Sequence, residues 1–444
     1  MAHDRLGEEP CRACRLDAAT DRARAHCAAM LRVVMPDSLP GLPSALFGGS
    51  RPRPGNRSAP LKIVAMETFP AVIPYRHGEV SAIISRAGVS DVVVKLVTDD
   101  GLVGWGESCM NCDTATTLAA IEAMRPFVLG RSPWQTEAIS RDVFVHGGWQ
   151  WEAMTGAFAF AGIDMALWDL CGKAAGQPLS HLFGGPVRES VDYFYYLAWG
   201  DPDSLRAQCA EGLARGHSVF YFKAGVDFDA ELAMLEVVRD ALGPGPRLRV
   251  DPNQAWPYAE ALGNVARMHA AVGLDFVEAP TKGGRHANWR ELTRMTGVPV
   301  CANEFLWTEA DAARIVTERA VDHMGFSPYF VGSLRRWHTL CHMAASADIL
   351  VHKHTHGEFG IAAAACHHIL LTLPNLARGS QQTHQLLAHD ILTKPLPIMD
   401  SARWGVIDLP GLGIEVDEAA LRDASERWRR DGDFRPYGDR FPVT

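Results

Sequence analysis

Six short apolar runs in the second half of the chain each end on a polar residue, at nearly constant spacing. The runs are SVFYFK, RLRVD, LDFVE, VPVCANE, HMGFS and ILVHKH, and they end at Lys223, Asp251, Glu278, Glu304, Ser327 and His354. The separations between these residues are 28, 27, 26, 23 and 27, and each interval has room for one strand, one helix and two loops. This repeat predicts an α/β fold built on a (β/α) barrel. A doubly wound open sheet competes with it, but we find no glycine-rich phosphate turn early in the repeat.

The segment before this repeat predicts a different kind of domain. The runs LKIVAMETFPAVI and DVVVKLVTDDGLVGWGES predict antiparallel strands, and the Asp100-Gly101 pair is a strong hairpin signal. An amphipathic helix over 116–129 and a helix over 156–175 that is apolar on nearly all sides follow. We expect an α+β domain over 59–185 and a barrel over 186–395. Residues 1–58 are rich in Arg, Pro and Gly and predict a poorly ordered extension.

The composition favours small-molecule chemistry. A net charge of -9 argues against a nucleic-acid partner. Asp164 and Asp169 interrupt the best apolar stretch, so we expect no membrane partner. The ten cysteines form no disulfide framework and we find no basic-then-apolar leader, so we expect a reduced, cytoplasmic protein. Cys11 and Cys14 form a CxxC without a second pair, which we interpret as coincidence rather than a zinc site.

Three carboxylates end successive predicted strands. Asp251, Glu278 and Glu304 would lie side by side at the barrel mouth, because the carboxyl ends of barrel strands converge there. Unpaired, they would repel one another strongly in a partly desolvated site. A divalent cation removes this conflict, and all-oxygen ligation suits Mg²⁺ or Mn²⁺ better than zinc. Singly, each could be an ordinary solvated or salt-bridged acid; in register they favour a metal site.

Two further strand-end residues predict acid/base chemistry. Lys223 precedes the three carboxylates and His354 follows Ser327, so the two side chains could face each other across the metal. The structural alternative for Lys223 is a salt bridge to one of the carboxylates. For His354 it is a structural role, since ten of the eighteen histidines lie between His323 and His389.

At these residues the sequence resembles the enolase superfamily, most closely its mandelate racemase-like and acid-sugar dehydratase branch. The resemblance runs from about Lys62 to Glu415 and rests on five motifs together: WGES at 105–108, AGIDMALWDLCGKAAGQPLSHLFGG at 161–185, VDPNQAW at 250–256, VEAP at 277–280 and ANEF at 302–305.

The resemblance implies an N-terminal capping domain over a modified TIM barrel of the (β/α)7β kind, with the segment 396–444 returning to the cap. It implies that Asp251, Glu278 and Glu304 bind Mg²⁺, with Mn²⁺ as the second metal that suits these ligands, and that Asn253 is a nearby polar partner. It also implies a Lys or His base that takes the proton α to a substrate carboxylate, through an enediolate stabilised by the metal. We further expect a homo-oligomer.

The chain departs from the family pattern at two strands. The second barrel strand usually ends Lys-x-Lys, and here Tyr221 replaces the first lysine, where it could donate a hydrogen bond to a substrate carboxylate or act as a phenolic acid. Ser327 stands where an aspartate usually orients the histidine, so His354 should be harder to protonate. Glu358 is a second candidate, because HGEFGIAAAA also resembles a glutamate motif of muconate-lactonising relatives. We rank His354 first.

The run His352-Lys353-His354-Thr355-His356 supports one other metal chemistry. Alternate residues of a strand share a face, so the three histidines could point into the barrel as in a zinc hydrolase. We rank this below the Mg²⁺ hypothesis, because such sites generally begin on the first strand.

The leading functional hypothesis is a Mg²⁺-dependent lyase that dehydrates a sugar acid or hydroxy acid. The same half-reaction without elimination gives a racemase, an epimerase or a cycloisomerase, and a non-catalytic binding relative is the alternative of another class. Substrate specificity should come from cap residues in 74–90 and around Trp149 and Trp151.

Overall fold

The chain falls into two units, Met1–Ser58 and Ala59–Thr444. The computed structural model describes residues 61–110, 113–147, 151, 153–283, 285–399 and 401–435. The predicted extension and the CxxC pair therefore lie outside the described residues. None of the described helices is both long and apolar enough to span a membrane.

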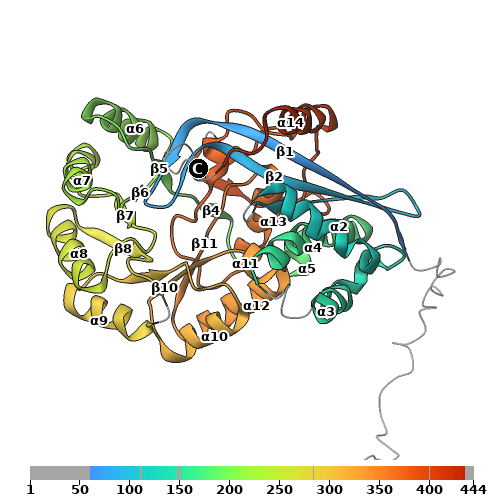
Figure 1. The fold of residues 1–444 in the computed structure, drawn as a ribbon, viewed down its shortest axis with the longest axis horizontal. Helices are drawn as coiled ribbons and strands as arrows, with labels where there is room; N and C mark the ends of the chain where they lie inside the picture. Colours follow the sequence, from blue (N-terminus) through green and yellow to red (C-terminus); the bar gives the residue numbers. More distant parts are fainter. Residues whose placement is uncertain are drawn as a thin grey trace, which may run out of the picture. The chain divides into compact units, whose positions relative to one another are not determined.

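The first part of the described chain is a three-stranded antiparallel sheet with helices against it (Figure 1). Its elements are β1 (Ile63–Val80), β2 (Ser85–Thr98), β3 (Val103–Cys109), α2 (Thr114–Val128), η3 (Pro133–Gln135), α3 (Thr136–Gly147), α4 (Thr155–Ala175) and α5 (Leu179–Leu182). Gly101 has a φ of 87°, a left-handed conformation that glycine adopts without steric cost, in the predicted hairpin between β2 and β3. The strands and both long helices of the cap are as predicted.

Helix α4 packs closely against β3 of the sheet. The closest approach is made by two glycines, since a Cβ added to Gly106 would lie 1.9 Å from the carbonyl oxygen of Gly162. Its two buried aspartates bind backbone amides of other elements: Asp164 accepts from Leu334 N at 2.8 Å, and Asp169 accepts from Trp105 N at 2.9 Å. The charges that interrupt this apolar stretch therefore act as hydrogen-bond acceptors inside the fold.

Seven parallel strands form the barrel sheet, in the order β11-β10-β9-β8-β7-β6-β5. Helices follow the strands and form an outer layer (Figure 1). The units are β5 (Tyr195–Leu197) with α6 (Pro202–Ala214), β6 (Val219–Lys223) with α7 (Phe228–Leu242), β7 (Arg247–Asp251) with α8 (Tyr258–Val272), β8 (Leu274–Glu278) with α9 (His286–Thr296), β9 (Val300–Ala302) with α10 (Glu309–Glu318), β10 (His323–Phe326) with α11 (Pro328–Val331) and α12 (Leu334–Ala345), and β11 (Leu350–Lys353) with α13 (Gly360–Leu370).

The segment 375–381 closes the barrel. On one side Val351 N donates to Asn375 O and Gln381 N donates to Lys353 O, both at 3.0 Å; on the other, Phe194 N donates to Ser380 O at 3.1 Å. The segment therefore lies between β11 and the start of the first barrel strand. Seven strand-helix units and a final closing segment give the (β/α)7β architecture that we expected.

The rest of the chain runs back to the first sheet. It contains η5 (Thr383–Leu386), η6 (Pro397–Met399), β12 (Arg403–Gly405), which pairs with β4 (Ser190–Asp192), and α14 (Glu418–Asp431). In Figure 1 α14 lies beside β1, and Glu418 forms a 2.8 Å ion pair with Lys95 of β2. The domain limits at 185 and 395 stay predictions.

The N-terminus of α13 is capped by the WGES motif of β3. Glu107 accepts hydrogen bonds from Phe359 N at 2.6 Å and from Ala362 N at 2.9 Å. Burial raises the pKa of Glu107 to about 7, and the neighbouring Asp91 has its pKa raised by burial and by Glu107. A carboxylate at a helix N-terminus satisfies free backbone donors and the helix dipole. The cap domain thus anchors the helix that follows β11, the last strand of the barrel sheet.

His367 of α13 allows a pH test of this packing. Its Nε2 donates a 2.7 Å hydrogen bond to Gly405 O, so in the neutral ring Nδ1 accepts from Tyr193 Oη, also at 2.7 Å. The ring stacks on Trp404. Burial lowers the pKa of His367 to about 3. Because the unfolded chain binds the proton first as the pH falls, stability from this residue is present above about pH 6.5 and is lost toward pH 3.

Between pH 7 and pH 5, the free energy of unfolding should fall by about 2 kcal/mol more in the wild type than in the His367→Gln variant, because the variant lacks this buried imidazole. Urea unfolding at the two pH values measures this. The exposed His181 supplies the control, since His181→Gln should keep the wild-type pH dependence. An unchanged pH dependence in His367→Gln would contradict the assignment.

Candidate active site

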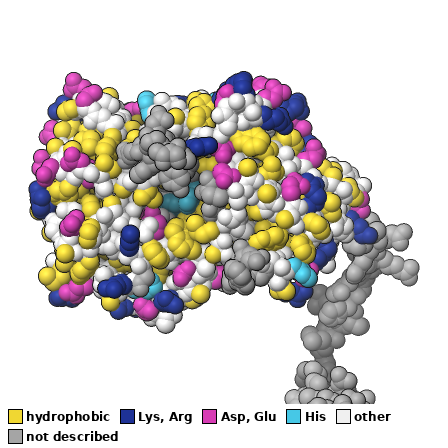
Figure 2. Space-filling model, viewed as in Figure 1, with side chains coloured by type: hydrophobic (Ala, Val, Ile, Leu, Met, Phe, Trp, Pro, Cys, Tyr) yellow, Lys and Arg dark blue, Asp and Glu magenta, His cyan; other side chains and the backbone are white. Residues whose placement is uncertain are grey.

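The strand-end residues meet at one mouth of the barrel. Lys223, Asp251 and Glu278 are the last residues of β6, β7 and β8, which are neighbours in the sheet. Glu304 follows β9 by two residues and His354 follows β11 by one. Figure 2 shows a hollow near the middle of the viewed face, with histidine side chains in it. The six predicted strand ends thus lie where the repeat placed them.

Asp251 is the centre of a buried hydrogen-bond network. Its Oδ2 accepts from Lys223 Nζ at 2.5 Å and from Tyr221 Oη at 2.6 Å. Lys223 Nζ also donates to Asn253 Oδ1 at 3.1 Å, and Asn253 Nδ2 donates to Glu304 Oε1 at 2.9 Å. Burial alone would lower the pKa of Lys223, but the attraction of Asp251 and Glu79 outweighs burial and raises it. The salt bridge that we considered as the structural alternative for Lys223 is present, and it keeps an ammonium group at the mouth.

Glu278 and Glu304 carry oxygens without partners. Both carboxylate oxygens of the fully buried Glu278, and Oε2 of Glu304, have no hydrogen-bond partner among the described residues. Burial and repulsion from Asp251 raise the pKa of Glu278 well above its usual range and that of Glu304 to about 7. Buried carboxylates are ordinarily paired or bound to metal. The unpartnered oxygens therefore fit a divalent cation, which would supply the missing interaction.

The backbone beside each carboxylate has an unusual conformation. Asn253, Ala279 and Phe305, one or two residues after Asp251, Glu278 and Glu304, have φ values of 46°, 36° and 70°. Left-handed φ values cost non-glycine residues roughly 1 kcal/mol each and tend to cluster at functional sites. Neighbouring strands hold these turns, since Gln254 N donates to Ala279 O at 2.8 Å and Ala279 N to Cys301 O at 2.9 Å.

His354 lies across the mouth from this network. Its ring stacks on Phe330, with centroids 5.6 Å apart, and lies edge-on to His356 at 5.2 Å. Burial and the nearby His356 and Lys223 lower its pKa well below 6.5. The buried Nδ1 of His354 and Oγ of Ser327 each lack a hydrogen-bond partner among the described residues, so Ser327 does not orient the ring in this structure. As expected, His354 is hard to protonate.

Glu358 is engaged elsewhere. Its Oε1 pairs with Lys353 Nζ, and its Oε2 accepts from Tyr329 Oη at 2.9 Å, all three side chains being buried. Lys353 alternates with His352 and His354 along β11 and so has the opposite orientation to them. Glu358 therefore lies behind the strand rather than in the mouth.

The described part of the chain contains two groups of three ligand-type atoms within 4.8 Å of one another: Glu278, Cys301 and His352, and Asp91, Glu107 and Cys109. The three predicted magnesium ligands, Asp251, Glu278 and Glu304, do not together form either group. Neither His354 nor His356 belongs to either group, and the strand alternation on which the zinc alternative rests does not reach His356, because β11 ends at Lys353.

Comparisons with known proteins identify the family. The N-terminal domain of mandelate racemase and muconate lactonizing enzyme matches residues 66–184, and the enolase C-terminal domain-like family matches residues 204–420. The chain belongs to the enolase superfamily. Within it, the chain is a member of the mandelate racemase and muconate lactonizing enzyme group.

Relatives in this superfamily have different reactions in their names. A probable glucarate dehydratase of Streptomyces coelicolor is 30% identical, covering 63% of this chain and 68% of the relative. L-Ala-D/L-Glu epimerase of Bacillus subtilis is 26% identical, covering 83% and 100%. The crystal structure of muconate lactonizing enzyme from Pseudomonas fluorescens with muconolactone has a TM-score of 0.76 and 28% identity, covering 82% of this chain and 100% of that one.

The enolase-superfamily cap contributes residues to the mouth that we did not predict individually. At the tip of the β1–β2 hairpin, Arg86 Nε donates to Glu79 Oε2 at 2.8 Å, and Arg86 also donates to His356 O. Tyr196 Oη of the first barrel strand donates to Glu79 Oε1 at 3.0 Å. Both cap residues lie in the predicted 74–90 segment, but no local pattern distinguishes them from its other polar residues.

The other predicted cap position lies elsewhere. Trp149 is outside the described residues, and Trp151 packs with the apolar cluster under the cap helices. A Cβ added to Gly147 or Gly156 would clash with Trp151, so its packing is close. The structure gives Trp151 a role in cap packing.

The unpartnered Glu278 leads to a metal-linked prediction. In chelator, the Glu278→Gln variant should melt within a few degrees of the wild type, because no hydrogen bond among the described residues is lost. Mg²⁺ should raise the Tm of the wild type, since a ligand that binds only the folded state stabilises it, and should leave that of the variant unchanged. Thermal melts followed by circular dichroism test this. Glu309→Gln, at an exposed position on α10, should retain the wild-type response; a full response in Glu278→Gln would refute the ligand assignment.

Proposed function

We propose that this protein catalyses Mg²⁺-dependent removal of the proton α to a substrate carboxylate, followed by loss of a β-hydroxyl group from a sugar acid or related hydroxy acid. One observation carries the proposal: three carboxylates lie at the ends of consecutive strands, two of them, Glu278 and Glu304, with unpartnered oxygens among the described residues, and Lys223 and His354 lie at the same mouth. The named relatives include a dehydratase, which supports elimination as the reaction.

Asp251, Glu278 and Glu304 would hold the metal ion. Bound Mg²⁺ would supply positive charge that stabilises the negative charge developing on the substrate carboxylate. Asn253 would keep its bonds to Lys223 and Glu304 and so fix the spacing between base and ligand. Tyr221, whose hydroxyl donates to Asp251, would orient that ligand rather than contact substrate.

His354 and Lys223 would share the proton transfers. A neutral imidazole accepts a proton, and the buried His354, whose ring nitrogen Nδ1 has no partner among the described residues, is suited to take the α-proton. The Lys223 ammonium group can give a proton to the departing hydroxyl, which leaves as water. Stacking on Phe330 holds the histidine ring in place without occupying its nitrogens.

Epimerisation is the second candidate function. It uses the same first step, and the chain is similar to the L-Ala-D/L-Glu epimerase over 83% of its length. Lys223 and His354 would then act as two bases on opposite faces of the α-carbon, and both would have to work as acid and as base. The low pKa of His354 makes its return of a proton less favourable. We therefore rank dehydration first.

The two reactions are separated by proton NMR in D₂O. The protein is mixed with a library of sugar, hydroxy and amino acids, with Mg²⁺ and with chelator. We expect a 2-keto-3-deoxy product for at least one hydroxy acid, with Mg²⁺ only. Deuterium at the α-carbon without loss of water would instead establish the epimerase. If no acid exchanges its α-proton, the enzyme proposal fails and a binding role replaces it.

Variants of the two bases test their separate roles. With the substrate identified in this way, His354→Asn should lose α-proton exchange and dehydration together, by at least about 100-fold. Lys223→Met should retain exchange but lose release of water. Equal loss of both signals in both variants would contradict this division of roles.

The expected homo-oligomer stays a prediction.

Glu358→Gln provides a contrast with His354→Asn. Breaking a buried ion pair by removing one charge costs about 3 to 5 kcal/mol, so this variant should unfold at lower urea concentration. Its exchange rate per folded molecule should stay within a few-fold of the wild type, because Glu358 faces Lys353 and Tyr329. A stable but inactive Glu358→Gln would reverse our ranking of the two residues.

A further inference from the structure

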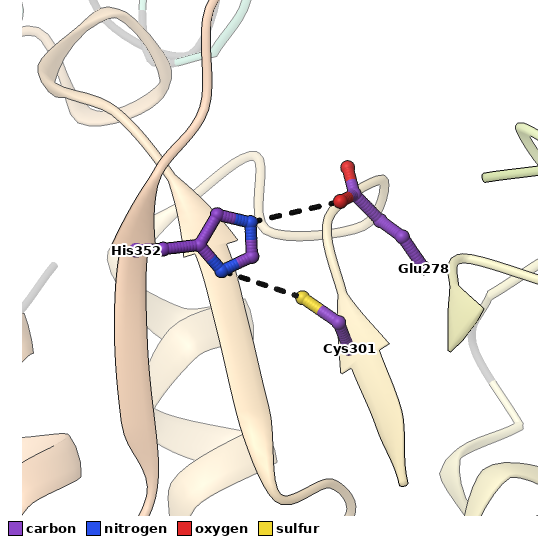
Figure 3. A group of neighbouring side chains, drawn as sticks. All are labelled: Glu278, Cys301 and His352. Carbon is purple, nitrogen blue, oxygen red and sulfur yellow. Dashed lines mark hydrogen bonds and ion pairs between the residues drawn. The ribbon is translucent and has the colours of Figure 1, made fainter. Parts of the chain in front are cut away.

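A buried histidine that the proposed mechanism does not use lies next to Glu278. Figure 3 shows the imidazole of His352 between Glu278 and Cys301, with a different ring nitrogen facing each of them. Nε2 lies 3.6 Å from Glu278 Oε2, and Nδ1 lies 4.0 Å from Cys301 Sγ. All three residues are at most 1% exposed. The ring therefore lies between a thiol and a proposed metal ligand, out of contact with water.

The ring reaches Glu278 by crossing a strand. His352 is on β11 and Glu278 on β8, and β10 and β9 lie between them in the sheet. The residue of β10 that pairs with His352 is Gly325, where a Cβ would lie 2.6 Å from His352 Nε2 and 2.8 Å from its Cε1. Phe276, also on β8, stacks on the imidazole with ring centroids 5.4 Å apart. Close packing on Gly325 and Phe276 thus fixes the ring where Nε2 faces the carboxylate.

The neighbours of the ring indicate which nitrogen carries its proton. Burial and the positive charge of Arg249 lower the pKa of His352 well below 6.5, so the ring is neutral and has one proton. Burial raises the pKa of the Cys301 thiol, which therefore keeps its proton and can donate it to Nδ1. An N–H at Nε2 then faces Glu278 Oε2. Neither of these two atoms has a hydrogen-bond partner among the described residues.

The thiol has one other acceptor within reach. Cys301 Sγ lies 3.5 Å from Ala302 O. If the thiol donated there, Nδ1 would carry the ring proton and the lone pair of Nε2 would face Glu278. A lone pair repels the ionised carboxylate, which is the form that binds a cation. The proton on Nε2 is therefore the arrangement that suits a metal ligand.

We propose that His352 is a positioning residue for Glu278: with Mg²⁺ bound, it donates a hydrogen bond from Nε2 that orients the buried carboxylate and stabilises its ionised form. The proposal rests on the proposed function in that Glu278 is a ligand of Mg²⁺. Donors behind metal ligands fix the orientation of the ligand and support metal affinity. Cys301 acts one step further back, since its thiol favours the ring with the proton on Nε2.

Calorimetric titration of metal-free protein with Mg²⁺ compares two substitutions of His352. His352→Leu removes the donor and should weaken Mg²⁺ binding by about 10- to 100-fold. His352→Gln places an amide N–H near the position of Nε2 and should stay within a few-fold of the wild type. The matched control is His323→Leu, which removes another buried imidazole packed on Phe276 and should leave Mg²⁺ affinity unchanged. Urea unfolding in chelator shows whether each variant folds.

NMR of Mg²⁺-saturated protein labelled with ¹⁵N at histidine gives a readout that packing alone would not change. The spectrum distinguishes a ring protonated at Nδ1 from one protonated at Nε2, and His352 should carry its proton on Nε2. Its signals are identified by their absence in His352→Gln or, if that variant does not fold, by their shift in Cys301→Ser. This measurement therefore decides the matter even if neither His352 variant folds.

Three results would overturn the proposal. The first is Mg²⁺ affinity that His352→Leu leaves unchanged. The second is an equal loss of affinity in His352→Leu and His352→Gln, which would mean that the ring only fills space. The third is a proton on Nδ1 of His352 in the Mg²⁺-saturated protein.

These results are separate from those for the proposed function. Wild-type protein with His352-dependent Mg²⁺ binding that exchanges no α-proton would overturn the proposed function and leave the role of His352 in place. Protein that exchanges α-protons with Mg²⁺, but whose Mg²⁺ affinity does not depend on His352, would overturn only that role. Absence of Mg²⁺ binding in the wild type would overturn both.

Discussion

Repulsion among buried carboxylates is the constraint on which the mouth of this barrel depends. Asp251, Glu278 and Glu304 lie out of water at the ends of consecutive strands. Asp251 binds Lys223 and Tyr221, whereas Glu304 accepts one hydrogen bond, from Asn253, and Glu278 has no hydrogen-bond partner among the described residues. These two glutamates keep unpartnered oxygens and raised pKa values. Such a site destabilises the metal-free fold and favours binding of a cation. Metal binding should therefore also stabilise the strand ends.

Much of the fold and the strand-end chemistry could be predicted because both depend on short-range periodicity. A repeat of 23 to 28 residues specifies a βα barrel, and barrel topology brings residues at strand ends together whatever lies between them. The Asp100-Gly101 hairpin and the buried helix α4 were predictable for the same reason. In each case the signal lies within one element or recurs at a fixed interval.

The remaining features depend on contacts between distant parts of the chain. The local pattern left Glu358 open as a base, and only the structure shows that Lys353 and Tyr329 engage it. Ser327 aligns with a residue that orients the histidine, yet no hydrogen bond joins it to His354 among the described residues. Glu79 and Arg86 reach the mouth because the β1–β2 hairpin extends over the barrel, which depends on the packing of the cap. The Cys301–His352 pair joins two strands that periodicity places two positions apart, but no motif marks it.

The WGES glutamate has a consequence for folding. Glu107 belongs to the cap, yet it binds the first backbone amides of α13, the helix that follows His354 in the barrel. A barrel expressed without its cap would leave these amides and the positive end of the helix dipole without a carboxylate. Conversely, in an isolated cap Glu107 and its neighbour Asp91 would lie without the α13 amides that Glu107 binds. We therefore expect the cap and the barrel to fold as one cooperative unit rather than as two exchangeable domains. A graft of this cap onto a foreign barrel would need a helix whose N-terminal amides can bind Glu107.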